Sequence, residues 1–137
     1  MELLDHLGPV DANQTVGDHA TACVDLAEFH RAFILIVTGD AATDATLDVA
    51  IHQATDTDCS DAKEMTSKAI TQLTDADEDA YVGIEIQTEE MDLDNGFHTL
   101  KAIVTVGTGT FDYALMIFGV DPRYEPRGTT GFDELVE

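Results

Sequence analysis

Apolar and polar residues alternate along much of the chain, which is the pattern of strands that bury one face. The alternation is clearest in residues 45–54, 81–88 and 97–106. Residues 33–37, with the sequence FILIV, instead form a continuous β-branched and aromatic run. Such a run is typical of a strand buried on both faces or lying across the middle of a sandwich. A further apolar strand is expected over residues 111–120, so the pattern predicts an all-β protein.

The spacing of these segments predicts about seven or eight short strands with no βαβ rhythm, as in an antiparallel β-sandwich or jelly-roll-like fold. The GTG turn at residues 107–109 suggests that the strands on either side form a hairpin. A further strand is expected within residues 21–26. Residues 61–73 fit a helix or a strand, and we favour a short strand in their second half. The inward positions predict one core, formed by Leu47, Val49, Ile51, Val82, Ile84, Ile86, Leu100, Val104 and Val106.

The chain has 137 residues, the usual size of one domain. We expect residues 1–120 to form the sandwich domain with an N-terminal lead-in segment. Residues 121–137 are expected to form a C-terminal arm and acidic tail, because the prolines at 122 and 126 cannot donate to a strand ladder.

The arm concentrates the residue types that dominate protein interfaces, arginine and a rigid aromatic. The candidate partner-binding residues are Pro122, Arg123, Tyr124, Pro126 and Arg127. The alternative is a plain terminus that packs loosely on its own domain.

Acidic residues dominate the charge, with 28 Asp and Glu against 6 Lys and Arg, a formal net charge of -22. This surface repels polyanions, which argues against nucleic acid and anionic membranes as partners. The hydrophobic fraction of 44% is too high for a disordered acidic chain. We therefore expect a folded protein from a halophile, because at molar salt a Debye length of about 3 Å screens the repulsion between carboxylates.

No catalytic or metal-binding motif stands out. Asp92, Asp94 and Asn95 are weak candidates for calcium, but they do not fit the spacing of an EF-hand loop. The histidines match no zinc motif, and nucleophile and phosphate-loop motifs are absent. Cys23 and Cys59 form no CxxC motif, and we expect both to be reduced thiols. We therefore expect no enzyme activity, no cofactor and no bound metal.

The N-terminal residues have neither a basic region nor a long apolar stretch. The sequence thus predicts cytosolic synthesis without a secretory signal, and no membrane-spanning segment.

Several segments resemble a group of small capsid-associated virion proteins of tailed viruses, of the decoration or cement type. They are residues 24–26 (VDL), 29–32 (FHRA), 45–49 (ATLDV), 53–56 (QATD), 68–73 (KAITQL), 92–97 (DLDNGF) and 119–126 (GVDPRYEP). The resemblance implies a structural protein of the virion that binds the major capsid protein and copies of itself, commonly as a homotrimer. The acidic composition points to a tailed virus of halophilic archaea.

Two other functions fit the composition. The first is a calcium- or carbohydrate-binding β-sandwich of the adhesion type, and the second is a small halophilic enzyme. The lack of tryptophan argues against a stacking platform for sugars, and a small filled sandwich leaves little room for an active-site pocket.

Overall fold

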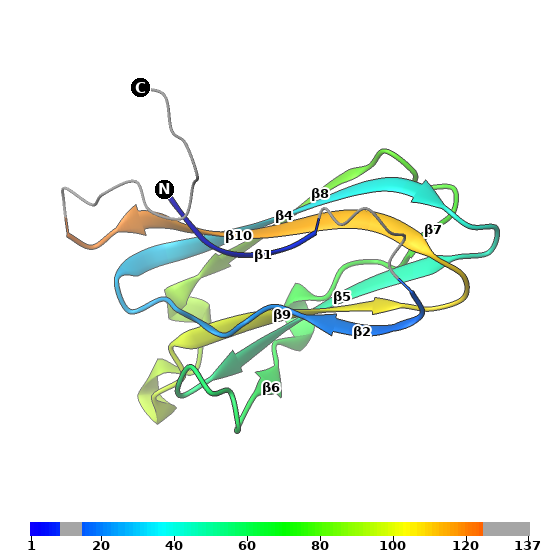
Figure 1. Cartoon of the computed structure of the whole chain (residues 1–137). Helices are drawn as coiled ribbons and strands as arrows, with labels where there is room; N and C mark the ends of the chain where they lie inside the picture. The colour runs from blue at the N-terminus through cyan, green and yellow to red at the C-terminus, as the bar shows by residue number, and fades with distance from the viewer. Residues whose placement is uncertain (9–14, 125–137) are drawn as a thin grey trace.

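The computed structural model describes residues 1–8 and 15–124. In this part of the chain ten strands form two antiparallel sheets that face each other (Figure 1), which confirms the predicted all-β sandwich. The strands are β1 (Glu2–Leu7), β2 (Gly17–Ala20), β3 (Val24–Asp25), β4 (Phe29–Ala41), β5 (Thr46–Ala54), β6 (Lys63–Glu64), β7 (Leu73–Thr74), β8 (Tyr81–Gln87), β9 (Thr99–Val106) and β10 (Phe111–Pro122). Three short 3-10 helices lie between strands: η1 (Thr66–Lys68), η2 (Thr88–Glu90) and η3 (Leu93–Asn95).

The sheet that we call sheet A has the strand order β1-β10-β4-β8. The other, sheet B, has the order β2-β9-β5-β6, with β3 paired to β9 and β7 paired to β5. In Figure 1 sheet A forms the upper layer and sheet B the lower one. The two long central strands of sheet A, β4 and β10, pair from Phe29 opposite Pro122 to Ala41 opposite Phe111.

One hydrophobic core fills the space between the sheets. Its members include the predicted Leu47, Val49, Ile51, Ile84, Ile86, Leu100, Val104 and Val106, all buried, while Val82 is half-buried and packs against them. Burial of each such side chain stabilises the fold by about 1.5–3 kcal/mol. The inward-facing positions that the alternation predicts are therefore confirmed.

Strand β4 is longer than the apolar run that predicted it, and its two faces differ. Ile34 and Ile36 are fully buried in the core. Phe33, Leu35 and Val37 point to the opposite side, where they are only half-buried. The run therefore lies in the middle of sheet A, with one face in the core and the other on the outside of the sandwich.

The predicted hairpin between residues 97–106 and 111–120 is wrong, because β9 belongs to sheet B and β10 to sheet A. The connection crosses between the sheets instead. There the N–H of Gly107 donates to the carbonyl of Thr46, and Gly109 adopts a φ of 80°. Both strands bury one apolar face, and alternation alone does not say in which sheet a strand lies.

Several short segments also differ from the expectation. The N-terminal lead-in is itself a strand, β1, at the edge of sheet A. Within residues 21–26 only β3 is a strand. Residues 61–73 contain β6 and η1, and in their second half, where we expected a short strand, only Leu73 enters one, β7.

Cys23 and Cys59 form a disulfide, so the expectation of reduced thiols is wrong. The bond joins the loop between β2 and β3 to the loop after β5, across 36 residues of sequence. The two loops lie together because β2, β3 and β5 all pair with β9. That proximity depends on the strand order, which cysteine spacing does not reveal.

Candidate functional site: the outer face of sheet A

The start of the predicted C-terminal arm belongs to the sandwich. Strand β10 continues to Pro122, two residues past the expected boundary, and the Nε of Arg31 donates to the Asp121 carboxylate at 2.7 Å. The prediction that the chain leaves its sheet at Asp121 is therefore wrong. Pro122 is tolerated because it ends the strand, where no further ladder bond is needed.

Arg123 is also held by its own domain. Its N–H donates to the carbonyl of Glu28 at 2.8 Å, its Nε to that of Phe29 at 3.1 Å and its Nη2 to the Thr88 hydroxyl at 3.0 Å. Tyr124, in contrast, is exposed. The candidate residues Pro126 and Arg127 lie outside the described residues, and a partner-binding role for the arm stays a prediction.

The weak calcium candidates do not form a cage. The Asp92 carboxylate accepts from the Lys63 ammonium at 2.5 Å and from the Asn95 amide at 2.8 Å, and these bonds lower the pKa of Asp92. Asp94 and Asn95 lie in η3. Within residues 1–8 and 15–124, no group of three or more His, Cys, Asp or Glu side chains is arranged to hold a metal ion.

Many acidic side chains in the loops accept hydrogen bonds from nearby backbone. Asp61 accepts from the N–H and the hydroxyl of Thr55, which lowers the pKa of Asp61. Asp77 accepts from the N–H of Thr74, and Glu78 from that of Ala41. These carboxylates fix loop conformations, which is a structural role.

An apolar surface lies on the outer face of sheet A, where cross-strand partners form rows across β10, β4 and β8. The middle row is Met116, Leu35 and Gly83, and the rows beside it are Ala114, Val37 and Tyr81 on one side and Phe118, Phe33 and Glu85 on the other. The next row is Val120, Arg31 and Gln87. Leu3 of β1 extends the face next to Phe118.

The outward positions of the central strands carry no charge over residues 33–37 and 114–120, in a chain with 28 acidic residues. Sheet B differs sharply: its outward positions include Asp48, His52 and Lys101. An apolar patch bordered by charged groups on one face of a soluble domain marks an interaction surface. The FILIV run is the sequence signal for this face, since a strand with one solvated face would alternate instead.

One end of this face is hollow and the other carries a projecting ring. The hollow, of about 250 Å3, is lined by Met1, Arg31, Ala32, Phe33, Glu85 and Val120. Arg31 closes its polar side: Nη1 donates to the Glu85 carboxylate at 2.9 Å, and Glu85 and Asp121 together raise the pKa of Arg31. Tyr81, at the other end of β8, is 77% exposed.

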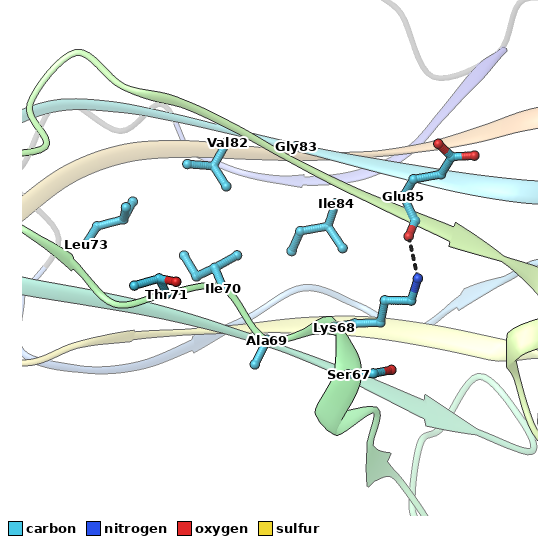
Figure 2. Close-up of a pocket in the computed structure, with 10 residues that line it drawn as sticks. All are labelled: Ser67, Lys68, Ala69, Ile70, Thr71, Leu73, Val82, Gly83, Ile84 and Glu85. Carbon is cyan, nitrogen blue, oxygen red and sulfur yellow. Dashed lines mark hydrogen bonds between the residues drawn. The ribbon is translucent and has the colours of Figure 1, made fainter.

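A second depression lies along the side of the sandwich between β8 and residues 67–73. Figure 2 shows Ile70 and Leu73 pointing toward Val82 and Ile84 across this groove, which has a volume of about 440 Å3. Lys68 bridges one end, because its ammonium donates to the Glu85 carbonyl at 2.9 Å and pairs with Glu90 at 2.7 Å. The groove is therefore partly closed by the chain itself.

Comparison of the chain with protein-family models, with curated proteins and with solved structures found no significant match. Among the described residues, no helix has the length and apolar character needed to cross a membrane.

Proposed function

We propose that this chain is a non-enzymatic structural protein of a virion, of the capsid-decoration or minor-capsid type, and that it works by binding other protein surfaces. The observation that carries the protein-binding part is the uncharged apolar outer face of sheet A on a chain with a net charge of -22. The virion part rests on the resemblance to capsid-associated proteins, which implies the major capsid protein and further copies of this chain as partners.

The physical setting favours contacts through such a face. At molar salt the Debye length is about 3 Å, so long-range attraction between charged surfaces is lost. Burial of apolar area keeps its strength, and salting-out ions increase it. A halophilic assembly protein is thus expected to join its partners through surfaces like the Leu35 and Met116 row.

The disulfide supports a working location outside the reducing cytosol. Structural disulfides persist on virion and cell surfaces, whereas cytosolic thiols are kept reduced. A chain made in the host cytoplasm would close the Cys23–Cys59 bond on reaching an oxidising environment. This fits a protein of the particle surface.

The calcium- or carbohydrate-binding alternative stays a prediction, since no contact in the described residues favours it. The Asp92 carboxylate is taken by Lys63 and Asn95.

The test is the composition of particles made with variant chains. Virus particles grown with the wild-type gene, with Leu35→Asp or with Ile103→Asp are purified on density gradients in molar salt, and the chain in the particle band is quantified by mass spectrometry. Leu35 and Ile103 are matched, because both are half-buried outward aliphatics in central strands, one in each sheet.

We expect the wild type and Ile103→Asp in the particle band and Leu35→Asp in the unbound fraction. A wild-type chain that is missing from purified particles would contradict the virion function. Equal incorporation of both variants would contradict the use of the outer face of sheet A.

A further inference from the structure

The outer face of sheet A carries a projecting side chain and a hollow at opposite ends of the same surface. Tyr81 projects at one end, and the hollow beside Phe33 and Glu85 lies at the other. A surface that carries both a projecting side chain and a hollow to receive it is suited to an isologous interface, in which the projecting side chain of each copy enters the hollow of the other. We propose that the partner of this face is a second copy of the chain, packed face to face about a two-fold axis. This inference rests on the proposed function, because it names one of the partners.

The register of β8 sets the geometry of the pair. Tyr81 and Glu85 lie in the rows on either side of the Gly83 row. Each is two residues from Gly83, or about 7 Å along the strand. A two-fold axis that runs in the interface along the middle row therefore exchanges the rows of Tyr81 and Glu85. Tyr81 of one copy then lies over the hollow of the other.

The hollow offers the contacts that a tyrosine needs. Its apolar wall includes Phe33 and Val120, against which the ring can pack. Its polar rim is the Arg31–Glu85 pair, within reach of the phenol oxygen. Gly83 leaves room beside it for the ring of Phe33, which would lie only 3.0 Å from a Cβ at position 83.

Charge contributes little to this contact. Arg31 is already paired with Glu85 and Asp121 of its own chain, so the contact across the axis rests on the apolar rows and on the fit of Tyr81 in the hollow.

The size of the face sets the expected affinity. Four strands spaced about 4.8 Å apart, over about nine residues of 3.3 Å each, cover about 500 Å2 per copy, or about 1,000 Å2 in a pair. This lies at the low end of specific interfaces, so we expect a pair that dissociates on dilution. A two-fold pair differs from the homotrimer that the resemblance implies.

The first test is the mass in solution by sedimentation equilibrium in molar salt, over a range of concentrations. The wild type should approach twice the chain mass of 14.8 kDa as concentration rises. Tyr81→Ala should weaken the pair at least tenfold, as expected for loss of a buried aromatic anchor. Ile103→Ala is the control, because Ile103 is a half-buried apolar residue at an outward position of sheet B, and it should pair like the wild type.

The second test maps the contact with a short bismaleimide, which leaves the native disulfide intact. Chains with Tyr81→Cys and chains with Glu85→Cys should cross-link when mixed, while neither should cross-link efficiently with itself. This pattern is specific to an axis through the Gly83 row.

Three results would overturn the pair: a wild type that stays monomeric at all concentrations, a mass of three chains, or weakening by Ile103→Ala and not by Tyr81→Ala. Such results would leave the proposed function standing if Leu35→Asp still removed the chain from particles. If the wild-type chain paired in solution but was absent from purified particles, the proposed function would be contradicted and the pair would stand.

Discussion

The close contact between Gly119 and Phe29 gives the sharpest stability prediction. A Cβ at position 119 would lie 2.6 Å from two ring carbons of Phe29, whereas ordinary contacts begin at 3.4 Å. Phe29 is 2% exposed and has no free space to move into without disturbing the core. The ring must therefore shift by about 0.8 Å in Gly119→Ala, and overpacking of this kind costs about 1–3 kcal/mol. Alanine offsets less than about 1 kcal/mol of this cost, because it loses less backbone entropy than glycine on folding.

We expect Gly119→Ala to lower the free energy of unfolding by about 1–2 kcal/mol, and Tm by about 3–7 °C for a chain of this length. Denaturant unfolding in molar salt measures the first and calorimetry the second. A double-mutant cycle with Phe29→Leu isolates the contact, because the smaller side chain removes the overlap. In that background Gly119→Ala should be neutral or slightly stabilising. Strictly additive costs would refute the proposed clash.

Three further predictions concern the disulfide, salt and a buried phenol. Replacing Cys23 and Cys59 by serine should lower the unfolding free energy by about 2–4 kcal/mol, because the bond closes a long loop in the unfolded chain; equal denaturation midpoints would contradict this. Dilution from molar to about 0.01 M salt lengthens the Debye length to about 30 Å, so repulsion between the surface carboxylates increases and the thermal midpoint of unfolding should fall. A midpoint that rises on dilution would refute this prediction. Burial raises the pKa of Tyr113 to about 12, so stability should be unaffected by this group below pH 10 and fall as the pH rises from about 10 toward 12. Phenolate absorbance of the wild type minus that of Tyr113→Phe should show the late titration, and a difference centred near pH 10 would contradict it.

The sequence predicted the strands and their inward faces well, because the two-residue alternation of apolar and polar side chains is a local property of a strand. Leu47, Val49 and Ile51 alternate with polar neighbours, and the structure buries them as expected. Which strands pair depends on contacts distant in sequence, so the connection after β9 was assigned to the wrong topology. The disulfide was missed for the same reason, since Cys23 and Cys59 meet only through the order of sheet B.

The candidate site was predicted less well. Proline and arginine after residue 120 suggested an arm, but Arg123 forms three hydrogen bonds to the domain from which it was expected to separate. The outer face of sheet A had a signal in the FILIV run, yet the run is equally compatible with a strand covered on both sides. Only the strand order, with β4 central in a sheet that has no third layer among the described residues, shows that Phe33, Leu35 and Val37 face outward.

The central claim, that the outer face of sheet A is covered by protein in the working assembly, is tested most directly by hydroxyl-radical footprinting. The chain is labelled in purified particles and as a dilute monomer in the same molar salt, and the modification of each residue is compared by mass spectrometry. The account predicts that Tyr81, Leu35 and Met116 are protected in the particle, while Ile103 on sheet B shows a smaller change. Equal labelling of Tyr81 and Met116 in the two states would contradict it.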